Sequence, residues 1–164
     1  MRKSSMPRLR HHALVLPLIF ITSSLSAQAR RPITEMDLFK FVWAADPQTS
    51  PNGSQVAFVR VNVNQEKDRY ETQIFVVPSN GTSAPRALTT GRSDRSPRWS
   101  PDGRTLAFVR SPDGPDGKPK DPQIFLLSMD GGEARALTNV PKGAGSPTWS
   151  PDGRTIAFIS TPNP

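Results

Sequence analysis

Two of the Ser-Pro-Asp-Gly tetrapeptides, at 100–103 and 150–153, hold the side chains that come closest to a catalytic set. Asp102 and Asp152 could act as paired acids, and Ser100 and Ser150 could act as nucleophiles. However, Ser, Pro, Asp and Gly at four successive positions is the composition of a β-turn. Neither serine has a base beside it in the sequence. We therefore predict that all four residues shape turns.

The rest of the chain offers little further chemistry. The only histidines are His11 and His12, and the chain contains no cysteine. This excludes Ser-His-Asp and Cys-His catalytic sets and the usual zinc sites from the segment after residue 29. Gly143–Pro147 has the wrong spacing for a G-x-S-x-G nucleophile turn, and the chain has neither a Walker A nor a G-x-G-x-x-G motif. We predict no catalytic residue, no metal ligand and no cofactor, and the binding residues are unknown.

The tetrapeptides belong to a longer repeat. Ser96–Arg110 (SPRWSPDGRTLAFVR) recurs 50 residues later as Ser146–Ser160 (SPTWSPDGRTIAFIS), with eleven of fifteen positions identical. Asp46–Arg60 (DPQTSPNGSQVAFVR) matches the middle copy at eight of fifteen positions. A fixed period of this length indicates a solenoid, a propeller or a similar array.

The first half of each repeat predicts an antiparallel hairpin. Thr105–Arg110 alternates polar or small residues with large apolar ones, which is typical of a half-buried strand, and Gln55–Arg60 and Thr155–Ser160 are its counterparts. The Ser-Pro-Asp-Gly turn joins this strand to a short one that carries Trp99 or Trp149.

The second half of each repeat predicts two more strands. Ile74–Val77 and Ile124–Leu127 are continuous apolar runs, and Asn80-Gly81 or Asp130–Gly132 follows them as a tight turn. A last short strand surrounds Ala87–Thr89 or Ala136–Thr138. Each unit thus supplies four strands.

Four strands in 50 residues is the content of one β-propeller blade. We predict an all-β fold, an incomplete β-propeller of about two and a half four-stranded blades with a short N-terminal helix. The WD repeat fits poorly because its period is about 40 to 45 residues. Kelch has a better period, but the dominant motif here is W-S-P-D-G; a β-sandwich is the remaining alternative.

The first 29 residues lie outside the repeats. A basic start is followed by the apolar stretch Ala13–Leu25 and by the A-x-A site Ala27–Ala29. We predict a secretory signal peptide, residues 1–29, cleaved after Ala29, and a periplasmic or secreted protein. A membrane anchor is the rival interpretation, but the apolar stretch is shorter than the roughly 20 residues that span a bilayer.

Cleavage would lower the formal charge from +7 to +3, because residues 1–29 contain four basic and no acidic residues. The mature charge is mixed rather than gathered in a basic cluster, so we expect no nucleic-acid partner, and no membrane association after cleavage. Without cysteine, an exported protein must be stabilised by packing rather than by disulfides.

A lead-in segment, residues 30–45, connects the leader to the repeats. Thr34 can cap a short helix over 34–41, in which Leu38, Phe41 and Val42 form an apolar stripe against the propeller edge, and Asp46-Pro47 ends it. The blades are then predicted at 46–95, 96–145 and, in truncated form, 146–164.

The last predicted strand has no third strand to pair with, and two and a half blades cannot close a ring of four to eight. We expect the chain to be the N-terminal part of a longer protein. We also expect Trp99 and Trp149 to pack between sheets rather than line a ligand channel. Three phenylalanines at equivalent positions should lie in the core: Phe58, Phe108 and Phe158. The polar hairpin tips 62–71 and 111–121 could contact a partner or substrate.

These features together resemble the N-terminal propeller of prolyl oligopeptidase family serine peptidases, above all the acylaminoacyl-peptidase and dipeptidyl-peptidase branches. The resemblance runs from Thr34 to Pro164 and rests on the exported leader, the short helix, the Asp46–Arg60 segment and the W-S-P-D-G repeats. TolB-type envelope propellers also carry W-S-P-D-G. The Leu38-Phe39 helix running into Asp46-Pro47-Gln48 favours the peptidases.

The resemblance implies a non-catalytic propeller that gates access of short peptides to a downstream α/β-hydrolase domain with a Ser-Asp-His triad. Its partners would be that domain of the same protein and the peptide substrate. None of the family's catalytic positions matches a residue of this chain. The alternative is a TolB-like periplasmic binding or interaction propeller without enzymatic activity.

Overall fold

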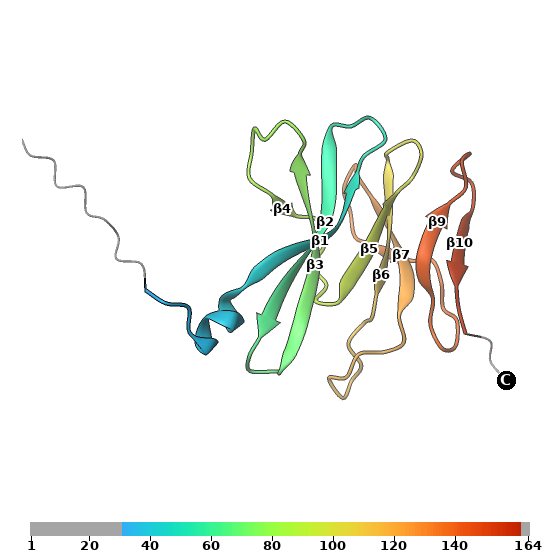
Figure 1. Ribbon diagram of the computed structural model, residues 1–164. Coiled ribbons are helices and arrows are strands. Elements are labelled where there is room, and N and C mark those ends of the chain that lie inside the picture. The colour runs from blue at the N-terminus through green and yellow to red at the C-terminus, as the bar shows by residue number, and fades with distance from the viewer. Residues whose placement is uncertain (1–30, 162–164) are drawn as a thin grey trace, which may run out of the picture. The chain divides into compact units, whose positions relative to one another are not determined.

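The computed structural model describes residues 31–161. The predicted signal peptide, residues 1–29, and its cleavage site lie outside this range. Ile33–Pro164 is one compact unit. It begins with a 3-10 helix, η1 (Glu35–Lys40), and continues in ten strands (Figure 1).

The strands form three separate antiparallel sheets within this unit. Blade 1 is the four-stranded sheet of β1 (Val42–Thr49), β2 (Gln55–Asn64), β3 (Arg69–Pro78) and β4 (Arg86–Ala87). Blade 2 is the four-stranded sheet of β5 (Asp94–Trp99), β6 (Thr105–Arg110), β7 (Gln123–Ser128) and β8 (Arg135–Ala136). The half blade is the pair of β9 (Gly145–Trp149) and β10 (Ile156–Ile159).

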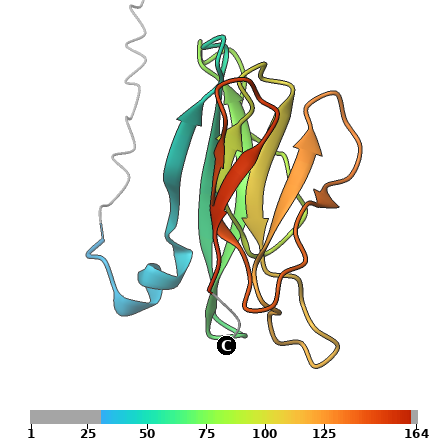
Figure 2. The ribbon, with the colours of Figure 1, turned by 90° about the vertical axis from the view of Figure 1, so that its right-hand side faces the viewer.

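Blade 2 lies between blade 1 and the half blade (Figure 1). The first strands of successive sheets are in contact: β1 contacts β5, and β5 contacts β9. Seen from the side of the half blade, the red β9–β10 hairpin stands in front of the yellow strands of blade 2 (Figure 2). Four-stranded sheets in this repeated arrangement are propeller blades, which confirms the predicted all-β, incomplete propeller.

The predicted hairpins are present in register. Trp99 pairs with Leu106 across one Ser-Pro-Asp-Gly turn, and Trp149 pairs with Ile156 across the other. The first strand of each sheet contains a β-bulge at a residue with positive φ followed by proline: Asp46 (46°), Ser96 (54°) and Ser146 (52°). Proline cannot donate a ladder hydrogen bond, so an interruption of the ladder accommodates it.

Two apolar layers hold the sheets together. Ala57 and Ile74 of blade 1 pack against Leu106, Phe108 and Leu127 of blade 2. The opposite face of blade 2 meets Ala144, Trp149 and Ile156 through its own layer, Ala107, Ile124 and Leu126. Side chains of one strand alternate between the two faces of a sheet, so both faces of blade 2 are buried.

The lead-in differs from the prediction. The helix ends at Lys40, and Val42 already belongs to β1, so β1 crosses the predicted division between residues 45 and 46. Asp46 therefore does not end a helix; it forms the bulge of β1. The helix does pack on the propeller, because η1 contacts β2, but the apolar stripe is only partly covered: Leu38, Phe41 and Val42 are 54, 49 and 51 % exposed. A 3-10 helix of six residues is too short to bury such a stripe.

The predicted aromatic core is confirmed only in part. Phe108 is fully buried and Phe58 is half-buried, whereas Phe158 is 41 % exposed. In the described residues no strand lies beside β10 on its far side. Phe158 therefore lacks the aromatic neighbour that Phe125 of β7 provides to Phe108, at a ring-centre distance of 5.9 Å. The burial expected for Phe158 is thus wrong for this structure.

Candidate functional site

The two aspartates of the tetrapeptides are turn residues, as predicted. The Ser100 hydroxyl donates to Asp102 Oδ1 over 2.6 Å, and the Arg104 N–H donates to the same oxygen over 3.0 Å. Asp152 accepts the same bonds from Ser150 and Arg154, at 2.6 and 3.1 Å. In both turns these hydrogen bonds lower the pKa of the carboxyl, the serine bond most. A carboxyl held ionised in this way is a poor proton donor near neutral pH.

The serines are equally committed to the turns. Ser100 Oγ accepts the N–H of Thr105 at 2.9 Å, and Ser150 Oγ accepts that of Thr155 at 3.0 Å. Ser50 repeats the bond in blade 1 by accepting the N–H of Gln55 at 3.0 Å. Each hydroxyl thus both donates and accepts within its own turn, and none is poised as a nucleophile.

The tryptophans join one sheet to the next. Trp99 packs on the layer between blades 1 and 2, and its indole N–H donates to the Gln48 carbonyl at 3.0 Å. Trp149 packs on the next layer and donates to the Arg98 carbonyl, also at 3.0 Å. The predicted packing between sheets is confirmed. The hydrogen bonds are an addition that the sequence did not predict, since the spacing does not reveal which carbonyl lies opposite an indole.

The Asp46–Gln48 segment, which carries part of the family resemblance, also links the blades. Asp46 Oδ2 accepts a hydrogen bond from Arg98 Nη1 of blade 2 at 2.8 Å, and Asp46 Oδ1 accepts one from Gln48 Nε2 at 2.7 Å. Gln48 in turn supplies the carbonyl that receives Trp99. This segment is therefore part of the blade-to-blade joint.

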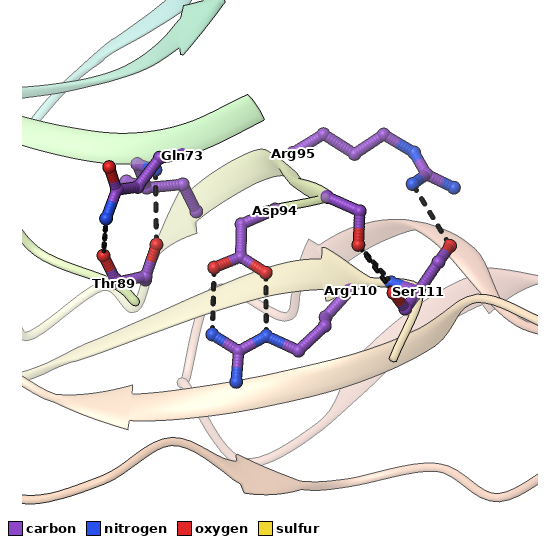
Figure 3. Close-up of polar contacts among 8 residues, drawn as sticks. Gln73, Thr89, Asp94, Arg95, Arg110 and Ser111 are labelled. Atoms are coloured by element: carbon purple, nitrogen blue, oxygen red, sulfur yellow. Dashed lines mark hydrogen bonds and ion pairs between the residues drawn. The ribbon is translucent and has the colours of Figure 1, made fainter. Parts of the chain in front are cut away.

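A buried ion pair in blade 2 was missed from the sequence. Asp94 is fully buried, and both of its oxygens accept hydrogen bonds from Arg110: from Nε at 2.7 Å and from Nη2 at 2.8 Å (Figure 3). The guanidinium also lies over the rings of Phe108 and Phe125, at 5.2 and 5.1 Å from their centres. Hydrogen bonding to Asp94 raises the pKa of Arg110 against the opposing effect of burial, so the guanidinium stays charged.

Other hydrogen bonds lie close to the pair (Figure 3). Ser93 Oγ donates to the Ser111 carbonyl at 2.5 Å, and Arg95 Nη1 donates to the Ser111 hydroxyl at 3.4 Å (Figure 3). On the blade 1 side, the Gln73 amide donates to the carbonyl of Thr89 (Figure 3). One sequence signal pointed to this pair: position 94 is an aspartate, whereas the equivalent positions of the other two repeats, 44 and 144, are alanines.

The predicted hairpin tips lie against each other. Arg69 at the end of the first tip is 3.7 Å from Glu71 and 3.9 Å from Asp113 of the second tip. Beside the second tip is an open groove of about 900 Å³. Its walls combine prolines with polar side chains and Phe125: Pro112, Pro119, Lys120, Asp121, Gln123, Phe125, Ala136, Thr138, Asn139, Val140 and Pro141.

Residues 31–161 show neither a metal-binding cluster nor a membrane-spanning helix. Residues 31–161 hold no group of three or more His, Cys, Asp or Glu side chains placed to bind a metal ion. None of the helices in this range has the length and apolar character needed to cross a membrane. The fold therefore defines a β-propeller segment. The polar side chains considered for catalysis stabilise its turns and the contacts between its blades.

The family comparison agrees with this class. The TolB beta propeller domain matches residues 16–163, most of the chain, so the protein belongs to this family. The match begins within the predicted signal peptide.

Individual relatives include peptidases. The chain is 43 % identical over 57 residues to "Uncharacterized peptidase YuxL" of Bacillus subtilis, a match that covers 34 % of this chain and 9 % of that protein. A solved acylaminoacyl peptidase in complex with Z-Gly-Gly-Phe-chloromethyl ketone is 25 % identical with a TM-score of 0.61, and the match covers 75 % of this chain and 18 % of that one. A putative TolB from Agrobacterium tumefaciens is 28 % identical with a TM-score of 0.57, over 70 % of this chain and 37 % of that one.

The predicted resemblance to peptidase propellers is thus confirmed at the level of the propeller. The chain spans less than a tenth of the length of YuxL and about a fifth of that of the acylaminoacyl peptidase.

Proposed function

We propose that this propeller is the non-catalytic part of an exported serine peptidase that hydrolyses short peptides. In this proposal the propeller limits access to an α/β-hydrolase domain encoded downstream. The observation that carries it is the 43 % identity to a peptidase, together with the fold shared with an acylaminoacyl peptidase. The lack of His and Cys after residue 29 fits a segment that leaves the chemistry to another domain.

The blade geometry offers a physical basis for such a role. The first strand of each sheet lies next to that of the following sheet, β1 beside β5 and β5 beside β9. In a closed propeller the blades surround a central channel. A channel walled by packed sheets admits an extended short peptide more readily than a folded protein. The groove beside the second hairpin tip is a surface on which a peptide could also be held.

The first test is the reading frame beyond Pro164. A G-x-S-x-G motif followed by Asp and then His supports the peptidase proposal. A stop codon after a few more blades contradicts it and favours the TolB-like binding propeller.

The second test uses the product of the complete reading frame. We expect Z-Gly-Gly-Phe-chloromethyl ketone to label this full-length protein covalently. A Ser→Ala change in the G-x-S-x-G motif should abolish peptide hydrolysis. Gating predicts that kcat/KM falls steeply as the peptide substrate is lengthened. Equal kcat/KM for short peptides and long unfolded chains would contradict the gating role.

Export needs its own measurement. The proposal places the mature protein in the periplasm or outside the cell, with Arg30 as its first residue. N-terminal sequencing of the protein from a periplasmic or culture fraction checks this. A mature protein that still begins at Met1 would overturn the export part without affecting the peptidase part.

A further inference from the structure

The three repeats differ at the two positions that form the buried ion pair of blade 2. Position 94 is Asp, whereas its counterparts 44 and 144 are alanines; position 110 is Arg, and its counterparts are Arg60 and Ser160. The half blade thus lacks both members, and blade 1 lacks only the acid. The repeat itself therefore does not require an arginine at this position. Arg60 lacks the aspartate that Arg110 has in Asp94.

The site around Arg60 has the same geometry as the occupied one. Ala44 pairs directly with Arg60, as Asp94 pairs with Arg110. The rings of Phe58 and Phe75 lie 6.0 Å apart at 31°, and those of Phe108 and Phe125 lie 5.9 Å apart at 31°. Arg60 lies over Phe75 at 5.1 Å, the distance between Arg110 and Phe125.

What differs is the hydrogen bonding of the guanidinium. Arg60 Nε is buried and has no hydrogen-bond partner among residues 31–161, whereas Arg110 Nε donates to Asp94 at 2.7 Å. A buried N–H of a charged group without an acceptor is unfavourable, and a carboxylate is the acceptor whose geometry matches a guanidinium. The Arg60 guanidinium therefore has the surroundings of a carboxylate-binding site, but blade 1 supplies no carboxylate to it.

Strand alternation shows where this carboxylate can come from. Ala57 and Ile74 face blade 2, so Phe58, Arg60 and Phe75 occupy the opposite face of blade 1. The equivalent face of blade 2, with Phe108 and Arg110, is the one that blade 1 covers. An acceptor for Arg60 must thus approach from the side of blade 1 away from blade 2.

We propose that Arg60 is a carboxylate-binding residue whose ligand comes from outside blade 1. The carboxylate belongs either to an acidic side chain of a segment that packs on this face or to a free molecule such as a peptide C-terminus. The inference stands on the comparison of the repeats and is independent of the proposed peptidase function.

The test observes the Nε–Hε signals of Arg60 and Arg110 by NMR in the ¹⁵N-labelled 164-residue chain. R60K and R110K assign the two signals, and Arg110 provides the reference for a carboxylate-bonded guanidinium. Sodium acetate is titrated at constant ionic strength against sodium chloride. We expect the Arg60 signal to move toward the Arg110 position and to saturate with acetate, while the Arg110 signal stays in place.

Two results distinguish the sources. In the product of the complete reading frame, an Arg60 signal that already lies at the bonded position without acetate identifies an acidic side chain of the protein. A signal that moves only on addition of acetate, and likewise with an N-acetyl dipeptide but not with its amide, identifies a free carboxylate.

The variant A44D provides the matched control, because it places an acid where blade 2 has Asp94. It should bring the Arg60 signal to the bonded position and remove the acetate response. If A44D does not fold, the backbone amides of residues 44 and 60 in R60K serve instead, and they should lose their acetate-dependent shift. The proposal is overturned if the wild-type Arg60 signal stays unbonded in acetate, or if chloride produces the same change.

Discussion

Blade 1 and blade 2 share one repeat, yet the same positions lie in different surroundings. Phe108 of blade 2 is fully buried beneath blade 1, whereas its counterpart Phe58 is half-buried on the open face of blade 1. Arg110 holds a buried aspartate, and Arg60 has none. The repeat determines the strand, the turn and the register, whereas the neighbouring sheet determines what each side chain contributes to stability. Four predictions test this difference, beginning with the largest expected effect.

Truncating the two equivalent phenylalanines should have unequal costs. F108A removes a fully buried ring, so we expect the free energy of unfolding to fall by about 3 to 5 kcal/mol. F58A removes a half-buried ring and should cost clearly less, about 1 to 2 kcal/mol. Urea unfolding of the 164-residue chain measures both. Equal losses would show that the open face of blade 1 is as tightly packed as the interior of the joint.

Neutralising the buried Asp94 should cause the second-largest loss of stability. D94N leaves Arg110 without a counter-charge in a largely buried place; because the guanidinium keeps some contact with solvent, we expect a loss of about 2 to 3 kcal/mol. R60M in blade 1 is the matched control. It removes no hydrogen bond described in residues 31–161 and only the contact of the guanidinium with the Phe75 ring, so it should change stability by less than about 1 kcal/mol. A larger loss in R60M than in D94N would reverse the contrast between the blades.

The loop before Asp94 should tolerate little change. A Cβ at Gly91 would lie 2.4 Å from Asp94 Oδ1, so G91A must displace the buried carboxylate, at an expected cost of about 1 to 3 kcal/mol. G145A is the control, because a Cβ there meets no atom within 4 Å. It should remain within about 0.5 kcal/mol of the wild type. Thermal unfolding followed by circular dichroism compares them, and similar melting temperatures would contradict the expected clash.

The smallest change in stability is expected for the turn that contains Asp102. The pKa of Asp102 is lowered below 3.8, first by the Ser100 hydroxyl and then by the Arg104 N–H. Its stabilisation is therefore present above the unfolded pKa and is lost as the pH falls through the folded value. D102A should melt below the wild type at pH 7, and the gap should narrow as the pH is brought below 3.8.

S100A removes the largest cause of this shift and should weaken the same pH dependence. A gap between wild type and D102A that widens in acid would show that the carboxylate is not stabilised by the turn.

Much of the fold was predictable because its signals are local. The Ser-Pro-Asp-Gly turns, the strand alternation of Thr105–Arg110 and the 50-residue period each depend on neighbouring residues, and together they led to the propeller. The lead-in was predicted less well. Leu38 and Phe41 have the spacing of an amphipathic helix, but the chain enters β1 at Val42 and leaves them exposed. Whether an apolar stripe is buried depends on the sheet that packs against it, and the residues of the stripe do not reveal that sheet.

The sequence by itself determined the class of protein, the position of the turns and the absence of His and Cys after residue 29. It also predicted that Asp102 and Asp152, and likewise Ser100 and Ser150, shape turns rather than carry out catalysis, because turn formation requires only the four residues of the turn. The tertiary structure alone decided that Asp94 meets Arg110, that Trp99 donates to Gln48 and that Arg60 lacks an acceptor. Such contacts depend on strand register and on which sheet face is covered, and these are set only when separate strands and blades pack together.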